Sequence, residues 1–99
     1  MKLTIDDKMY ELDWKEAAVL LVLRLVDWHA LTLSDVELVA GNYNRAVQLV
    51  KRLVKMGFLK EFRVRKLRIY ALTELGERAA DEVRRKAEEA GLWKAGLLP

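Results

Sequence analysis

The sequence predicts a mainly helical α+β fold, in which four helices are combined with a short strand and one small β-hairpin. Three observations lead to this fold class. Apolar residues recur with helical spacing over most of the chain, capping residues and glycines separate those stretches, and the spacing becomes alternating after Gly57. The 99 residues are the length of one domain. Within it we expect an N-terminal arm at 1–12, a core at 14–90 and an apolar tail at 91–99.

The first helix is preceded by an arm. Residues 2–12 alternate between apolar and polar around a turn-like Asp-Asp pair, which is typical of a short hairpin or an extended arm. Asp13 and Glu16 have the spacing of a capping box, so the helix should begin at 14 and continue to about 28. This helix is apolar on nearly all sides, and a single domain of this size rarely covers two apolar faces.

Two shorter helices are expected next. After an extended link at 31–33, Ser34 and Glu37 have the spacing of a second capping box, and a brief helix at about 35–40 should end at Gly41. A cap at Asn42 or Asn44 then begins a helix that reaches residue 56.

The last part of the chain combines a hairpin and a helix. The hairpin turns at Arg65-Lys66, and its residues alternate between two faces. One face carries Phe62, Val64, Leu67 and Ile69, and the other carries Glu61, Arg63, Arg68 and Tyr70. Thr73 caps a helix at about 74–90, which Gly91 closes.

Composition excludes several classes of protein. The apolar fraction of 53% is too high for a disordered chain, and the absence of cysteine removes disulfides and thiolate metal sites. His29 is the only histidine, too few for a typical zinc site. No apolar run approaches the ~18 residues of a membrane span, and residues 1–13 lack the apolar region of a secretory signal.

Catalytic chemistry has no basis in the residues either. The sequence contains no nucleophile paired with a base, no phosphate-binding glycine loop and no cluster of metal ligands. We therefore expect a cytoplasmic protein of prokaryotic type that is not an enzyme and has no cofactor, metal or small-molecule ligand. Its abundant Val, Leu, Glu and Arg resemble hyperthermophile usage.

The order of elements, with particular residues, resembles the winged helix-turn-helix superfamily and its small MarR-, ArsR- and PadR-like regulators. The resemblance covers about 14–90. It rests on the stretch 33–41, on Ala46, Val50 and Leu53, on residues 57–59 where the helix at 42–56 ends, and on the stretch 70–76. It implies that the helix at 42–56 enters the major groove of DNA as a recognition helix and that the hairpin is the wing.

The residues themselves support DNA binding at both elements. A helix at 42–56 would bury its apolar face and expose polar groups of the kind that contact bases and phosphates. The expected contacts from this helix are Asn42, Tyr43, Asn44, Arg45, Gln48, Lys51, Arg52 and Lys55, with Ser34 at the cap of the preceding helix. By itself such a charged face is more often only solvated.

The wing strengthens the prediction. Arg63, Arg65, Lys66 and Arg68 place four positive charges at its tip with only Glu61 nearby, and like charges at that distance repel one another. DNA phosphates would relieve this repulsion, with release of counterions. The whole chain, in contrast, carries a net charge of only +3.

Excess apolar surface predicts a homodimer. Helix one has a second apolar face, the last helix carries a stripe of Ala79, Ala80, Val83, Ala87 and Ala90, and the tail contains Leu92, Trp93, Leu97 and Leu98. A two-fold dimer joined through helix one and the C-terminal helix and tail would cover them and place two recognition helices about 34 Å apart. A tail folded back onto its own domain is the alternative.

Two other functions remain open from the sequence. The same fold can serve as a protein-protein interaction subunit of a larger assembly, because a fold does not determine a function. Binding of structured RNA is a third hypothesis, which predicts a preference for A-form duplexes or loops over B-form DNA.

Overall fold

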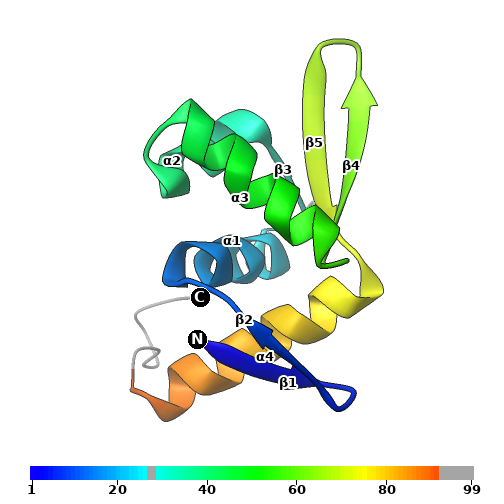
Figure 1. The fold of residues 1–99 in the computed structure, drawn as a ribbon. Coiled ribbons are helices and arrows are strands. Elements are labelled where there is room, and N and C mark those ends of the chain that lie inside the picture. Colours follow the sequence, from blue (N-terminus) through cyan, green and yellow to red (C-terminus); the bar gives the residue numbers. More distant parts are fainter. Residues whose placement is uncertain (27–28, 92–99) are drawn as a thin grey trace.

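The computed structural model describes residues 1–26 and 29–91. In these ranges the chain forms four helices, a two-stranded sheet and a three-stranded sheet (Figure 1). The elements follow the order β1 (Lys2–Ile5), β2 (Lys8–Glu11), α1 (Trp14–Leu25), β3 (Ala30–Thr32), α2 (Leu33–Ala40), α3 (Tyr43–Lys55), β4 (Leu59–Val64), β5 (Leu67–Leu72) and α4 (Glu74–Glu89). The predicted α+β fold class is confirmed.

The N-terminal arm is a hairpin. β1 pairs with β2 in antiparallel register, and Asp6 and Asp7 at the turn have φ of 51° and 66°. Positive φ at both positions matches the right-handed twist of the strands, and aspartate tolerates it. The hairpin lies beside α4 on the side of the molecule away from the wing (Figure 1).

Helix α1 begins at the predicted capping box. An Asp13 carboxylate oxygen accepts from the Glu16 amide at 2.7 Å, and Glu16 Oε1 accepts from the Asp13 amide at 2.8 Å. The helix ends at Leu25 instead of about 28, because Val26 adopts an extended conformation with ψ of 143°. Residue 28, the predicted end, lies outside the described residues.

The predicted cap of α2 is wrong by two residues. Thr32 is the cap: its hydroxyl accepts from the Asp35 amide at 3.2 Å, and the Asp35 carboxylate accepts from the Thr32 amide at 2.9 Å. Thr32 is also the last residue of β3, paired with Ile69, so the sheet sets where the helix begins. Ser34 lies in the first turn of α2 and is not its cap.

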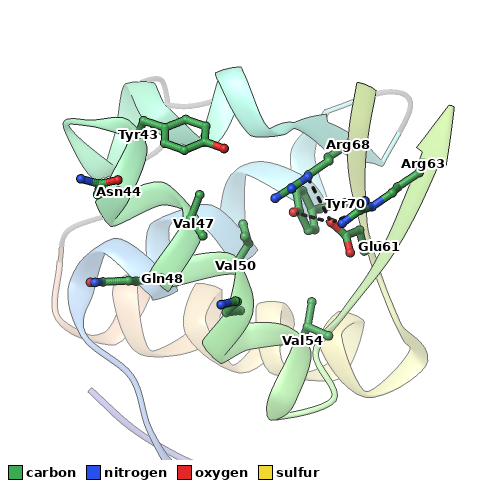
Figure 2. Close-up of a pocket in the computed structure, with 11 residues that line it drawn as sticks. Tyr43, Asn44, Val47, Gln48, Val50, Val54, Glu61, Arg63, Arg68 and Tyr70 are labelled. Atoms are coloured by element: carbon green, nitrogen blue, oxygen red, sulfur yellow. Dashed lines mark hydrogen bonds and ion pairs between the residues drawn. The ribbon is translucent and has the colours of Figure 1, made fainter. Parts of the chain in front are cut away.

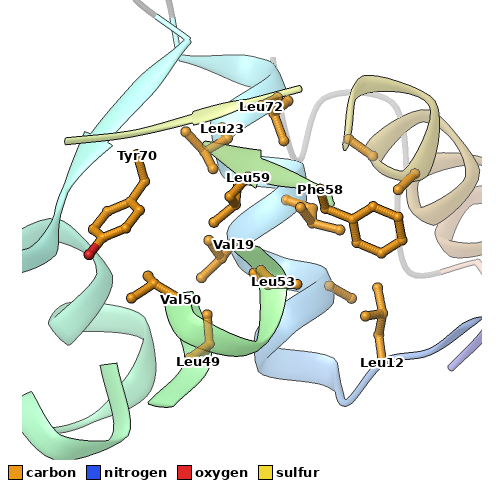
Figure 3. Close-up of a cluster of buried hydrophobic side chains, with 14 of the residues drawn as sticks. Leu12, Val19, Leu23, Leu49, Val50, Leu53, Phe58, Leu59, Tyr70 and Leu72 are labelled. Carbon is orange, nitrogen blue, oxygen red and sulfur yellow. The ribbon is translucent and has the colours of Figure 1, made fainter. Parts of the chain in front are cut away.

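The core lies between α1, α3, α4 and the base of the wing. Phe58, Leu53 and Leu12 are fully buried there (Figure 3). Tyr10 packs against Phe58 with ring centroids 4.9 Å apart. In the parts of the chain that the structure describes, no helix is long and apolar enough to cross a membrane.

The expected dimer stripe of α4 is covered within the chain. Ala79 and Ala80 are fully buried, Val83 is 2% exposed and Ala87 is 9% exposed, because α4 packs against α1 and β1. The inference that this stripe needs a second copy is therefore wrong, and only Ala90 of the set is exposed. The tail residues of the same prediction lie outside the described residues.

Candidate nucleic-acid interface

Helix α3 buries one side and presents a polar ridge on the other. Asn42 is its cap, with Oδ1 accepting from the Arg45 amide at 2.9 Å. Ala46, Leu49, Val50 and Leu53 are its buried residues. Since successive helical residues are about 100° apart, the residues on the side opposite to these four can be identified from their spacing, and we call them the ridge. The ridge consists of Asn44, Gln48, Lys51 and Lys55, which are all exposed.

The wing is the hairpin of β4 and β5. Arg63 pairs with Arg68 across the strands, and Arg65 and Lys66 form the turn, with Arg65 at φ of 58°. The two predicted faces of the wing are confirmed by this register. The face with Glu61, Arg63, Arg68 and Tyr70 looks toward α3 (Figure 2).

A groove of about 680 Å³ lies between α3 and the wing. Its apolar lining comes from Val47, Val50 and Val54 of α3, and its polar lining comes from both elements (Figure 2). The polar residues and the tyrosines that line it are Tyr43, Asn44, Gln48, Lys51, Glu61, Arg63, Arg68 and Tyr70. The fold thus brings six of the twelve contacts expected from the helix and wing into one groove.

Glu61 sits between the two wing arginines. Its Oε1 accepts from the Tyr70 hydroxyl at 2.8 Å and lies 4.0 Å from Nε of both Arg63 and Arg68. Burial, followed by the hydrogen bond to Glu61, raises the pKa of Tyr70 above its usual value. The cations of the wing are therefore not equivalent. Arg63 and Arg68 share one carboxylate, whereas Arg65 and Lys66 at the tip make no ion pair with any described residue.

Arg52 has a structural partner that the sequence pattern did not reveal. Its Nε lies 2.9 Å from Oε2 of Glu16, which is 2% exposed, and its Nη2 donates to the Glu11 carbonyl at 2.8 Å. Arg52 and Arg45 occupy the flank of α3 that faces α1, where they line a second hollow with Trp14 and Glu16. The capping-box spacing located Glu16 but not its contact with α3.

The remaining predicted contacts lie around these two hollows. Gln48 lines both of them. Lys55 is exposed at the end of α3, the cap Asn42 is exposed at its start, and Ser34 is in the first turn of α2. Trp14, 71% exposed, and Lys15, whose Nζ donates to the Ala40 carbonyl, were not expected at this surface.

Among the described residues, no group of three or more His, Cys, Asp or Glu side chains is placed to hold a metal ion.

Comparison of the sequence with models of protein families and with curated proteins finds no match. Solved structures, in contrast, share the fold. The adhesin competence repressor AdcR of Streptococcus pyogenes matches with a TM-score of 0.68 and 21% identity, over 83% of this chain and 62% of its own. The haem sensor PefR of Streptococcus agalactiae, in complex with haem, matches with a TM-score of 0.67 and 22% identity, over 84% of this chain and 60% of its own.

The zinc-responsive MarR family member ZitR of Lactococcus lactis matches with a TM-score of 0.64 and 14% identity, over 96% of this chain and 72% of its own. The chain spans less than two thirds of the length of AdcR and PefR. At these identities the likeness concerns the fold. The chain has the winged helix-turn-helix fold that its sequence predicts.

Proposed function

We propose that this protein is a transcription regulator that binds double-stranded DNA, with α3 in the major groove and the wing, residues 61–70, on the minor groove and phosphates. The observation that carries the proposal is the groove that joins the polar ridge of α3 to the wing arginines. A helix of about 10–12 Å diameter fits a major groove about 12 Å wide. A hairpin beside it can then follow the adjacent backbone.

The distribution of charge also supports DNA binding by the ridge of α3 and the wing. The ridge and the wing together carry Lys51, Lys55, Arg63, Arg65, Lys66 and Arg68 against the single carboxylate of Glu61. These residues have a net charge of +5, although the whole chain has a net charge of only +3. Positive charge is therefore concentrated where phosphates would lie, and each neutralised phosphate releases counterions.

The contacts divide into two kinds. Asn44 and Gln48 on the ridge would face base edges, and Lys51 and the wing cations would face phosphates. Around them, Ser34, Asn42, Tyr43, Arg45 and Lys55 would contact the sugar-phosphate backbones on either side. We leave Arg52 out of this set, since its guanidinium already binds Glu16 and the Glu11 carbonyl.

Binding as a homodimer is part of the proposal. On α1, Ala18, Leu21, Val22 and Leu25 follow helical spacing and none of them is buried. This apolar face, instead of the covered stripe on α4, would join two copies, and the tail 91–99 would add a further contact. Two recognition helices about 34 Å apart would then contact a near-palindromic site. Sedimentation at several concentrations tests this, and a Val22→Glu variant that dimerises as the wild type does would contradict it.

The test of DNA binding compares two variants of equal charge. In the first, Arg63, Arg65, Lys66 and Arg68 are all replaced by alanine. In the control, the same is done to four cations of α4, on the opposite side of the molecule: Arg78, Arg84, Arg85 and Lys86. Each variant removes four of the positive charges from a chain of net charge +3, so the change in net charge is the same in both.

Fluorescence anisotropy with a labelled duplex at several salt concentrations gives the affinity and its salt dependence. The wing variant should bind more weakly, and the slope of log K against log salt should fall by about 0.9 for each phosphate that is no longer neutralised. The control should keep most of the wild-type slope. Equal effects from the two variants would contradict a DNA-binding wing. Competition by an A-form RNA duplex that exceeds that of DNA would favour the RNA hypothesis.

One observation favours a second candidate, a protein-protein interaction subunit. The face of the wing that looks away from α3 is apolar and open: Phe62, Val64 and Leu67 are 48%, 56% and 48% exposed. Exposed apolar residues in contact with one another often mark an interface. Under this alternative, Phe62→Ser and Leu67→Ser would abolish the assembly function, while the wing variant described above would leave it intact.

A further inference from the structure

We propose that α3 selects A·T base pairs, with Asn44 and Gln48 each bound to an adenine and Val47 in contact with a thymine methyl group. This inference rests on the proposed function and adds the class of DNA sequence that the same groove recognises. It is carried by the positions of three side chains on the first two turns of α3 and by the location of Arg45 on the flank of the helix instead of on its exposed ridge.

The two amides lie where a recognition helix enters the groove most deeply. Asn44 and Gln48 are four residues apart on the exposed ridge, directly opposite the buried side of α3. Both line the groove that faces the wing (Figure 2). The N-terminal part of a recognition helix is the part that contacts base edges, so these side chains, and not those near residue 55, meet the bases first.

Both amides are available for an external partner. Neither side chain makes a hydrogen bond with any other residue that the structure describes, whereas the nearby Asn42 amide oxygen is used in capping α3. A carboxamide has a donor and an acceptor side by side, which match N7 and N6 of adenine in the major groove. Guanine offers two acceptors there and is matched by arginine or lysine instead.

An apolar side chain lies beside the two amides, on the side of α3 toward the wing. Val47 is half-buried, and with Val50 and Val54 it forms the apolar lining of the groove. The major-groove edge of an A·T pair carries the C5 methyl group of thymine, a natural apolar partner. Cytosine would place a hydrogen-bond donor at this edge, opposite valine methyl groups that cannot accept from it.

The basic residues of α3 lie off this part of the ridge. Arg45 lies on the flank toward α1, in the hollow with Trp14 and Glu16, and Arg52 is bound to Glu16. Lys51 and Lys55 follow one and two turns after Val47, toward the end of the helix. The first two turns of the ridge therefore present adenine-matching groups and no guanine-matching group among the described side chains.

The helix geometry also gives the spacing of the contacts. Four helical residues rise about 6 Å, and base pairs follow one another about every 3.4 Å, so the two adenines should lie about two steps apart. In a dimeric site, this short A·T element would appear once in each half.

Selection of binding sites from random duplexes, with the purified full chain, tests the inference. The wild type should enrich A·T pairs at the two positions that Asn44 and Gln48 contact. Gln48→Arg should change one of these positions to guanine, and Gln48→Ala should reduce discrimination at that position alone by roughly tenfold. The control Lys51→Ala should lower affinity for all sequences while leaving the consensus unchanged, since a lysine near phosphates carries little sequence information.

Three results would overturn the inference. A consensus with G·C pairs at the contacted positions, or one that Asn44→Ala and Gln48→Ala leave unchanged, refutes it while DNA binding stands. Absence of binding to any duplex by folded protein refutes the proposed function, and the inference with it. Circular dichroism of each variant establishes the folded state, and exposed helical positions such as these should leave it intact.

Discussion

The junction between α4 and the base of the wing predicts an unusual outcome for Gly76→Ala. Inside a helix, alanine is normally more stable than glycine by about 1 kcal/mol, so helix propensity alone predicts stabilisation. A Cβ at Gly76, however, would lie 1.9 Å from the Phe58 carbonyl oxygen and 2.9 Å from its carbon. That oxygen also accepts from the Thr73 amide at 3.0 Å, so the backbone has little freedom to move away.

The expected change in the free energy of unfolding combines three contributions. Displacing α4 enough to fit the methyl group would strain the packing by about 1–3 kcal/mol and weaken one hydrogen bond that is worth about 1 kcal/mol. After subtraction of the propensity gain, we expect a net loss of about 2 kcal/mol in the free energy of unfolding. In a domain of this size that lowers Tm by roughly 8–16 °C.

Thermal unfolding followed by circular dichroism in the far ultraviolet measures the change. Glu77→Ala, at the exposed neighbouring position of the same helical turn, is the control and should change Tm by only a few degrees. The direction of the change in Tm distinguishes the steric clash, which lowers Tm, from helix propensity, which raises it. A Gly76→Ala variant with a Tm equal to or above that of the wild type would refute the steric argument.

Three further predictions concern the interface. Glu61→Gln removes a carboxylate from the groove and keeps a hydrogen-bond partner for Tyr70, so duplex affinity should rise about two- to fivefold at low salt; weaker binding would contradict this. Arg52→Ala should lower the free energy of unfolding by about 1–2 kcal/mol, because Glu16 loses its partner while Arg52 itself is half-exposed. The same variant should leave the salt dependence of DNA binding unchanged. Lys51→Ala should instead leave stability unchanged and reduce the salt dependence of DNA binding. The raised pKa of Tyr70 means that the folded state favours the protonated phenol. The stabilisation of the folded state by this phenol is complete below the usual pKa of 10.0 and is lost as the pH rises through and above that value. The free energy of unfolding should therefore fall between a pH below 10.0 and a pH above it, and Tyr70→Phe should remove this fall.

Local spacing predicted much of the fold because the interactions concerned are local. The capping box of Asp13 and Glu16 begins α1 where expected, and the alternation after Gly57 gives the register of the wing. The start of α2 was predicted wrongly because two overlapping segments have the spacing of a capping box, one from Thr32 and one from Ser34. Pairing of Thr32 with Ile69, far away along the chain, decides between them.

In the candidate site, too, local spacing predicted some features and long-range packing set the others. Amphipathic spacing predicted which residues of α3 are exposed, but it treated Lys51 and Arg52 as equivalent, since a helical pattern does not show what lies opposite each flank. Only the packing of α1 against α3 brings Glu16 to Arg52, and for this reason we leave that cation out of the proposed DNA contacts.

The sequence by itself therefore determined the order of elements, the exposed face of α3 and the two faces of the wing, because capping and periodicity act over a few residues. The tertiary structure decided which wing face looks at α3 and which cations have carboxylate partners. It also showed that the alanine stripe of α4 is already covered by α1 and β1. These features depend on contacts between residues far apart in the chain, which short-range patterns do not encode.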